Sequence, residues 1–234
     1  GTKTPVQADI TEISTDTRNL PEGCLFIALR GAKFDGHAFV HNAVTEGAVA
    51  AVTDQQMGDN PCIVVGDTGQ ALLDIASLYR SKFDIPVVGI TGSVGKTTTK
   101  EMTASVLSQK FKTLKTEANL NNEIGCPKTL LGLTREHGAA VIEMGMNHFG
   151  EISRMSRCTK PTMAVITNIG FSHVENLGSQ EGILKAKLEM LEGMNPHAPL
   201  IVSGDDPLLS PLRETLEGRL VYTFSTEGNP ADVS

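Results

Sequence analysis

The most informative run of residues is Gly89-Ile-Thr-Gly-Ser-Val-Gly-Lys-Thr-Thr-Thr-Lys100. It begins inside an apolar segment of strand length, residues 86–91. It leads into a helical pattern over residues 97–111, with Met102, Val106 and Leu107 at apolar spacing. Glycines let backbone N–H groups turn around phosphate oxygens, and the start of a helix adds the positive end of its dipole. The run therefore predicts a phosphate-binding loop between a buried strand and a helix.

The loop offers specific ligands to a nucleotide. Lys96 would reach the terminal phosphates, and the Thr97 hydroxyl would bind Mg²⁺. The general spacing G-x-x-x-x-G-K-[ST] asks for glycine where Ile90 stands, whereas the core T-G-x-x-G-K-T is intact. A glycine turn that binds no nucleotide is the competing interpretation, and the flanking strand and helix argue against it. The residues expected to contact ATP phosphates are Gly92, Ser93, Val94, Gly95, Lys96, Thr97 and Thr98.

A second feature is an acidic residue at the end of another apolar run. Phosphate-loop enzymes hold their metal with an acid beyond a neighbouring strand. Residues 139–142 are apolar and Glu143 follows them directly. Taken alone, such a residue is more often a solvated strand end, but next to a phosphate loop we expect it to be a metal ligand.

Outside these motifs, the pattern from residue 86 onward repeats strand, loop and helix. Strands are expected at 87–91, 140–143, 163–167, 200–203 and 220–224. Such alternation is typical of a mostly parallel sheet covered by helices, with ligands beyond the carboxyl ends of the strands.

Residues 1–83 show a smaller α/β pattern. Strands are expected at 24–29, 48–52 and 62–65, and helices at 37–46, ended by Gly47, and at 70–82. Asp84-Ile-Pro86 then breaks the pattern. The prediction is an α/β protein with two domains, residues 1–84 and 85–234.

Composition excludes several classes of protein. Lys and Arg number 20 against 27 Asp and Glu, a net charge of −7 with no basic run, so a nucleic-acid partner is not expected. The four cysteines are far apart and form no C-x-x-C pair, which indicates buried, reduced thiols.

The sequence has neither a long apolar run nor a charged leader, so we expect a cytoplasmic protein without membrane insertion. The chain starts without Met and ends on a polar tail, so we expect a piece of a longer protein.

Several segments together resemble the Mur ligases of bacterial cell-wall synthesis. They follow the order of that family over nearly the whole chain, and they are specific as a set although each is weak alone. The segments are Ser14-Thr-Asp-Thr-Arg18, Gly23-Cys-Leu-Phe-Ile-Ala-Leu-Arg-Gly31, Phe34-Asp-Gly-His37, Thr91-Gly-Ser-Val-Gly-Lys-Thr97, Asn119-Leu-Asn-Asn-Glu-Ile-Gly125, Glu143-Met-Gly-Met-Asn147, Gly150-Glu-Ile152, Thr167-Asn-Ile-Gly-Phe-Ser-His173 and Ala186-Lys187.

The resemblance implies an ATP-dependent amide ligase with a small UDP-binding domain, a phosphate-loop ATPase domain and two Mg²⁺ ions. Residues 143–152 are similar to the branch that joins D-alanyl-D-alanine to UDP-N-acetylmuramoyl-tripeptide through an acyl phosphate. A monomer is expected. In the family, a third domain and the adenine contacts come after the part matched here, so we expect these 234 residues alone to bind ligands weakly and to ligate poorly.

The resemblance also implies substrate-binding residues. A carboxylate such as Asp16 can accept from the uracil N–H, and the Arg18 guanidinium can donate to phosphate or carbonyl oxygens. The sequence leaves open which substrate group Asp16 and Arg18 each bind. The alternative is that the two residues only form an ion pair with each other at the surface. The residues expected to bind the UDP substrate are Thr15, Asp16, Thr17, Arg18, Phe34, His37, Asn121 and Asn122.

The implied metal ligands are Thr97, Glu143, His173 and Lys187, of which Lys187 is carbamylated by CO₂ in the family. The helical positions of Leu184, Lys187, Leu188 and Leu191 form one stripe, which would desolvate the lysine and favour the neutral amine that CO₂ attacks. Without the family, the alternatives are a solvent-facing or capping histidine at His173 and, at Lys187, a lysine that reaches solvent from the helix edge. The expected catalytic residues are Lys96, Glu143, His173 and Lys187.

Three other functions remain open from the sequence. The first is a sibling amide ligase that adds a different amino acid. The second is a phosphoryl-transfer enzyme or switch ATPase that uses the same loop. The third is a nucleotide-binding module without catalysis.

Overall fold

The computed structural model describes residues 9–31 and 34–233, and it divides into two compact units, Gly1–Leu72 and Leu73–Ser234. The first unit is built on a four-stranded parallel sheet. Its strand order is β1 (Ile13–Ser14), β2 (Leu25–Ile27), β5 (Ala50–Thr53) and β6 (Cys62–Val64). A short hairpin joins β3 (Arg30–Gly31) to β4 (Phe34–Asp35). The 3-10 helix η1 (Gly36–Phe39) and helix α1 (Val40–Thr45) follow it.

Helix α2 (Thr68–Arg80) contains the boundary between the units. Its last turns pack with the second unit: the Tyr79 hydroxyl donates to the Leu133 carbonyl at 2.7 Å, and Arg80 Nε donates to the Thr159 carbonyl at 3.1 Å. The two compact units therefore divide within α2. The domain boundary expected at residue 84 stays a prediction.

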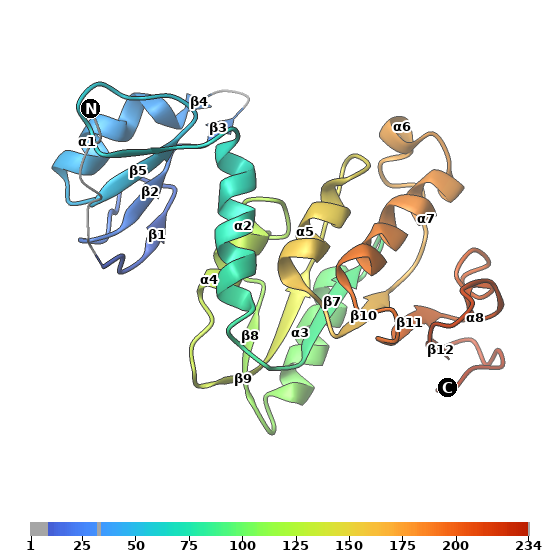
Figure 1. Cartoon of the computed structure of the whole chain (residues 1–234). Coiled ribbons are helices and arrows are strands. Elements are labelled where there is room, and N and C mark those ends of the chain that lie inside the picture. The colour runs from blue at the N-terminus through green and yellow to red at the C-terminus, as the bar shows by residue number, and fades with distance from the viewer. Residues whose placement is uncertain (1–8, 32–33, 234) are drawn as a thin grey trace. The chain divides into compact units, whose positions relative to one another are not determined.

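The second unit is a six-stranded sheet in which every pair of neighbours is parallel. Figure 1 shows its strands in the order β12, β11, β10, β7, β9, β8. The strands are β7 (Val87–Thr91), β8 (Lys112–Lys115), β9 (His137–Glu143), β10 (Met163–Ile166), β11 (Leu200–Ser203) and β12 (Val221–Phe224). The strand before the phosphate loop, β7, thus lies between β10 and β9, as a ligand-binding position in such a sheet requires.

Side chains alternate between two apolar layers, one on each face of this sheet. One face packs with α3 (Lys96–Leu107) through Val88, Ile90, Val141, Val165 and Ala104. The other face carries the larger core, which is shared with α4 (Gly125–Leu131), α5 (Glu151–Thr159), α7 (Gln180–Leu188) and the 3-10 helix η2 (Glu189–Gly193). The short helices α6 (Val174–Leu177) and α8 (Leu212–Thr215) complete the unit. Because both faces are covered, the strands consist of nearly continuous apolar runs.

The α/β class with mostly parallel sheets is confirmed, and the five strands expected in the second domain are present. Several details differ. The two-residue strands β1, β3 and β4 of the first unit were not expected. Strand β8 was missed, because its Lys-Thr-Leu-Lys sequence has little apolar character. In α3, Met102 and Val106 are 65% and 72% exposed, and the helix buries Lys100 and Ala104 instead.

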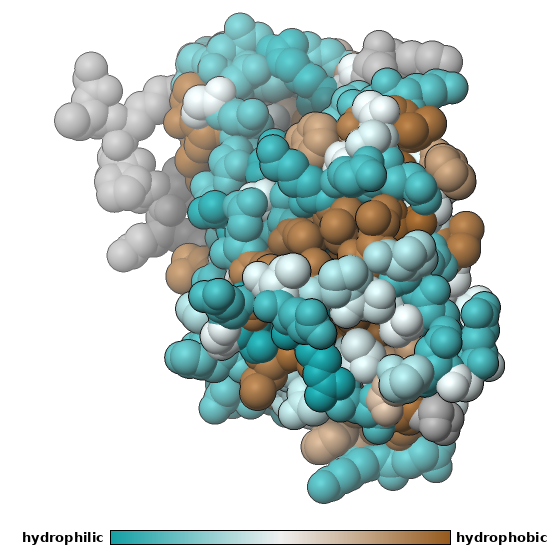
Figure 2. Space-filling view, turned by 90° about the vertical axis from the view of Figure 1, so that its right-hand side faces the viewer, coloured by the Kyte–Doolittle hydropathy of each residue, from teal (hydrophilic) through white to brown (hydrophobic). Residues whose placement is uncertain are grey.

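Figure 2 faces the side of the molecule that carries α6, α7 and β12 in Figure 1, and there apolar side chains form a band between polar ones. Strand β12 ends the strand order of this sheet on one side. Beyond it, among the described residues, a single parallel β-bridge joins Phe224 to Val233. Within the described part of the chain, none of the helices combines the length and the apolar character that a membrane span needs.

Candidate active site

The loop between β7 and α3 has the backbone that its glycines predict. Gly92 has φ +154° and Gly95, the N-cap of α3, has φ +80°, both in the region that favours glycine. Ile90, which stands where the general motif has glycine, is a fully buried residue of β7. At that position the chain is still an ordinary strand, so glycine is not needed.

Lys96 is held at this loop. Its Nζ donates to the Gly92 carbonyl at 2.8 Å and to the Ser93 carbonyl at 3.3 Å. Burial lowers the pKa of Lys96, and the Glu143 carboxylate opposes that shift. The ammonium is therefore pre-positioned over the loop by backbone oxygens.

Glu143 ends β9, the strand beside β7, and its side chain is almost fully buried. The Thr97 hydroxyl donates to Oε2 at 3.0 Å, and Asn121 Nδ2 donates to Oε1 at 2.8 Å. The Glu143 N–H donates to the Thr116 hydroxyl at 2.9 Å. The structure thus brings together Thr97, Glu143 and Asn121, three residues that were each expected at a ligand site from separate motifs.

Lys187 and His173 line a cavity of about 270 Å³ next to the loop. Lys187, on α7, is 2% exposed; burial, reinforced by the nearby Lys96, lowers its pKa to about 7. His173 is exposed, with φ +68° just before α6. The lining residues are Gly92, Lys96, Asn119, Asn121, Asn122, Gly145, Met146, Asn147, Glu151, His173 and Lys187. The expected burial of Lys187 is confirmed.

The donor set fits one metal ion directly. Mg²⁺ prefers oxygen ligands and keeps several waters, so two protein oxygens beside a phosphate loop are enough. Thr97 Oγ1 and Glu143 Oε2 provide such a pair. Among the described residues, no group of three or more His, Cys, Asp or Glu could hold a metal. His173 and Lys187 would fit a second Mg²⁺ only if the lysine amine became an oxygen donor.

The remaining phosphate-loop residues differ in exposure. Ser93 is buried, and its N–H donates to the Asn168 carbonyl at 3.1 Å. Val94, Thr97 and Thr98 are exposed at the loop and at the start of α3. Asn122 lies before α4, and its Oδ1 accepts from the N–H groups of Ile124 at 3.1 Å and Gly125 at 2.8 Å.

The residues expected in the first unit fall into two groups. Thr15, Asp16, Thr17 and Arg18 follow β1, where Arg18 Nε donates to Asp16 Oδ1 at 2.9 Å and the Arg18 side chain is 88% exposed. In the second group, Phe34 is 56% exposed but His37 is buried. His37 Nδ1 lies 2.6 Å from Asp35 Oδ1, and its Nε2 accepts from the Asp54 N–H at 3.1 Å. His37 thus has both ring nitrogens engaged inside its own unit.

Two further residues at the site, Lys100 and Thr116, were not expected from the sequence. Lys100 is 1% exposed; its Nζ donates to the Thr116 carbonyl at 2.7 Å and lies 3.9 Å from Glu143 Oε2. A buried cation beside a buried carboxylate offsets part of the desolvation cost of both. The i, i+4 spacing from Lys96 places Lys100 on the same side of α3 and could have drawn attention to it. Thr116 follows the strand that was missed.

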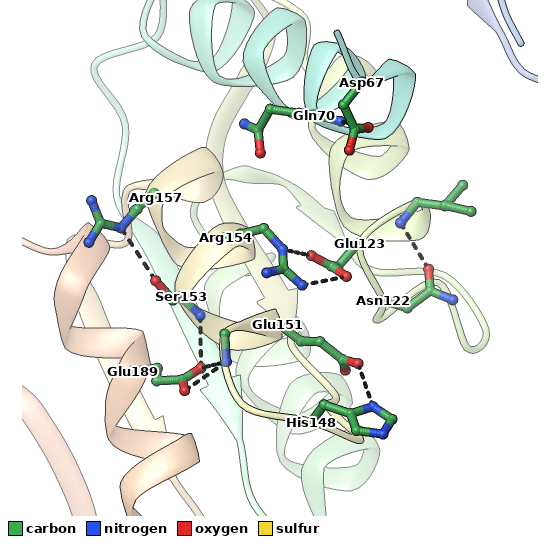
Figure 3. A network of polar contacts seen from close by, with 12 residues as sticks. Asp67, Gln70, Asn122, Glu123, His148, Glu151, Ser153, Arg154, Arg157 and Glu189 are labelled. Carbon is green, nitrogen blue, oxygen red and sulfur yellow. Dashed lines mark hydrogen bonds and ion pairs between the residues drawn. The ribbon is translucent and has the colours of Figure 1, made fainter. Parts of the chain in front are cut away.

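A polar network around the first turn of α5 connects three segments that line the cavity (Figure 3). Arg154 Nη2 donates to Glu123 Oε2 at 3.0 Å, which ties down the asparagine loop. The Asn147 N–H donates to Glu151 Oε2 at 2.8 Å, and the Gly150 N–H donates to Glu189, two residues after Lys187, at 2.8 Å. One helix end therefore fixes the asparagine loop, the segment after β9 and the end of α7.

Fold and site together define an α/β protein of phosphate-loop architecture. Two family models match the chain, "Mur ligase family, catalytic domain" over residues 9–76 and "Mur ligase middle domain" over residues 90–234. The chain therefore belongs to the Mur ligase family.

Individual relatives are similar over nearly all of this chain. The UDP-N-acetylmuramoyl-tripeptide--D-alanyl-D-alanine ligase of Synechocystis is 45% identical over 94% of this chain and 49% of its own length. Among solved structures, MurF of Acinetobacter baumannii superposes with a TM-score of 0.89 at 39% identity, covering 95% of this chain and 49% of that one. MurF ligase of Thermotoga maritima in complex with ADP has a TM-score of 0.86 at 31% identity, covering 93% and 51%. The chain spans about half the length of the curated relatives it matches.

Proposed function

We propose that this chain is the substrate- and ATP-binding part of a monomeric, cytoplasmic ligase that joins D-alanyl-D-alanine to UDP-N-acetylmuramoyl-tripeptide. The observation that carries the proposal is the Thr97–Glu143 contact of 3.0 Å beside a phosphate loop. Lys96, His173 and Lys187 line the adjoining cavity. The names of the relatives support this choice of reaction over a sibling ligase.

The two domains would divide the substrates between them. Residues 1–84 would hold the UDP end of the precursor, with Thr15, Asp16, Thr17 and Arg18 at the carboxyl end of β1. Phe34 would line the same pocket, and the enclosed His37 would support it from behind. Residues 85–234 would bind ATP through residues 92–98, and Asn121 and Asn122 would meet the carboxylate end of the precursor.

The reaction would run in two displacements. A terminal carboxylate oxygen of the tripeptide attacks the γ-phosphorus of ATP, the bond to the β-phosphate oxygen breaks, and ADP leaves. The amine nitrogen of D-alanyl-D-alanine then attacks the acyl carbon, the bond to the phosphate oxygen breaks, and the amine releases a proton. Both steps gather negative charge, which the Lys96 ammonium and the N–H groups at the start of α3 stabilise.

Mg²⁺ ions, when bound, would neutralise part of the charge on the phosphates. Thr97 and Glu143 would hold one ion. His173 and Lys187 would hold the other after the neutral lysine amine has attacked CO₂ and lost a proton, which gives a carbamate with two oxygens. A lysine whose pKa is about 7 has a large neutral fraction at neutral pH, and this supports the modification.

Nucleotide binding tests the loop assignment. Lys96→Ala should weaken ATP binding by about tenfold or more, since a charge-assisted hydrogen bond contributes about 1.5–3 kcal/mol. Titration calorimetry of the full-length enzyme with MgATP measures this. The control is Lys128→Ala on α4, an exposed lysine of the same unit, which should bind like the wild type. Equal ATP affinity in wild type and Lys96→Ala would refute the assignment.

Substrate profiling of the full-length enzyme tests the reaction. Phosphate release should require UDP-N-acetylmuramoyl-tripeptide and should be stimulated by D-alanyl-D-alanine above other amines. Stimulation by another amino acid would favour a sibling ligase. ATP turnover that ignores the precursor would favour a phosphoryl-transfer enzyme.

A further inference from the structure

The phosphate loop is braced by a neighbouring segment that the catalytic scheme leaves unused. Residues 167–170 follow β10, which pairs with β7 on the side opposite β9 (Figure 1). Asn168 Oδ1 accepts from the Val94 N–H at 3.0 Å, and Asn168 Nδ2 donates to the Val94 carbonyl at 3.1 Å. One side-chain amide therefore pairs with both polar groups of a single loop residue.

Three more hydrogen bonds reinforce this pairing. The Ser93 N–H donates to the Asn168 carbonyl at 3.1 Å, and the Thr167 hydroxyl donates to the Val94 carbonyl at 2.6 Å. The Gly170 N–H donates to the Ser93 hydroxyl at 2.8 Å. Five bonds thus join residues 167–170 to Ser93 and Val94, the two central residues of the loop.

The bracing segment, residues 167–170, also explains why position 92 is a glycine. A Cβ on Gly92 would lie 1.8 Å from Thr167 Oγ1, so no side chain fits while the segment is in place. The tight approach at Gly92 and the hydrogen bonds at Ser93 and Val94 are separate observations of the same contact. Together they show that the loop is shaped by β10's carboxyl end as well as by its own sequence.

This contact determines which N–H groups can face an anion. The N–H groups of Ser93 and Val94 are already donated to Asn168. The first N–H groups of a helix have no acceptor inside the helix, and in α3 these belong to Lys96, Thr97 and Thr98. The phosphates are therefore directed to the helix end, where Lys96 and Thr97 lie.

We propose that Asn168 is a positioning residue, which sets the loop so that the terminal phosphates of the nucleotide meet the start of α3. This inference rests on the proposed nucleotide binding. Asn168 itself does not touch the phosphates; it acts through Val94 and Ser93.

Two variants separate shape from charge. Asn168→Ala removes both bonds to Val94. Asn168→Asp is nearly isosteric, but it loses the donor to the Val94 carbonyl and adds a negative charge beside an anion site. We expect Asn168→Ala to weaken MgATP binding by about tenfold, equivalent to about 1.4 kcal/mol, and Asn168→Asp to weaken it further. Asn195→Ala is the matched control, because Asn195 Oδ1 also accepts a backbone N–H, that of His197, in an exposed turn of the same unit.

The readouts are MgATP affinity by calorimetry and hydrogen exchange of the loop peptide without nucleotide. Faster exchange at Ser93 and Val94 in Asn168→Ala, together with weaker ATP binding, supports the inference. Wild-type exchange and wild-type ATP affinity in a folded Asn168→Ala would overturn it. If that variant does not fold, Thr167→Val, which removes one bond to the loop at similar volume, takes its place, and unchanged loop exchange and ATP affinity in it would equally overturn the inference. Both readouts are taken in the full-length enzyme. No ATP binding by the full-length wild type would instead refute the proposed function, while the exchange measurement would still report on the bracing.

Discussion

Lys187 shows most clearly how burial prepares a side chain for chemistry. Its ammonium is removed from water on α7, and the Lys96 charge adds a second, smaller penalty, so its pKa falls to about 7. The neutral amine is a nucleophile, whereas the ammonium is not. The helical stripe around Lys187 predicted this burial. His173 is exposed and is the N-cap of α6, a setting that agrees with the alternative to a metal ligand.

The lowered pKa makes stability depend on pH. Between about pH 7 and the ordinary value of 10.5, the unfolded chain carries the Lys187 proton and the folded chain does not, so stability rises with pH. Relative to Lys187→Met, the wild type should gain up to about 1.4 kcal/mol per pH unit in this window. Urea unfolding in bicarbonate-free buffer at pH 7 and 9 measures the difference. Lys185→Met, an exposed lysine of the same helix, should run parallel to the wild type; a parallel Lys187→Met profile would contradict the prediction.

At the scale of elements, the turn that starts α5 connects the parts of the candidate site. Gly150 opens the helix, and both oxygens of Glu189 accept its N–H, at 2.8 and 2.9 Å. Negative charge at a helix start is favourable because the helix dipole is positive there. The contact also ties α5 to the end of α7, which carries Lys187 (Figure 3).

Glu189 and Glu192 provide a matched pair of variants on η2. Glu189→Gln should lower the free energy of unfolding by about 1–2 kcal/mol, because a half-buried charged cap is lost. Glu192 accepts from the Ser153 hydroxyl and from Arg157 on an exposed flank, so Glu192→Gln should cost less than about 0.5 kcal/mol. Urea unfolding at pH 7 tests the ranking, and equal costs would show that the helix-end contact has no special value.

The elements themselves were largely readable from local patterns. Strands with continuous apolar runs, such as β7, β10 and β11, were found nearly to the residue, since burial on both faces requires such runs. Strand β8 has mostly polar residues at the edge of the sheet, where one neighbour suffices. The buried face of α3 was misjudged because it contains Lys100, whose ammonium meets the Thr116 carbonyl and the Glu143 carboxylate, both from outside the helix.

At the scale of the molecule, the reactivity of the four cysteines can report on the folding of each unit. Cys24 is buried and Cys62 is partly exposed in the first unit, while Cys126 and Cys158 are buried in the second. Burial raises the pKa of Cys126 to about 12 and also raises the pKa of Cys158. Thiols of this kind are inert while their unit is folded.

We therefore expect one fast-reacting thiol in the native protein. A disulfide reagent such as DTNB at pH 8 should label Cys62 first, and the other three should react only as their units unfold in urea. Cys62→Ser should abolish the fast phase. A fast phase that persists in this variant would mean that a second thiol is exposed in the folded protein.

Short stretches of the sequence were enough to predict the phosphate loop, the acid after a neighbouring strand and the alternation of strand and helix. Loop conformation and apolar periodicity depend on residues that are close together in the chain. The pairing of Asn168 with Val94, of Lys100 with Glu143 and of Glu189 with Gly150 came only from the folded chain. Those pairs join residues 39 to 74 positions apart. Their meeting depends on the order in which strands add to the sheet and on how helices pack over it, and no short segment contains that information.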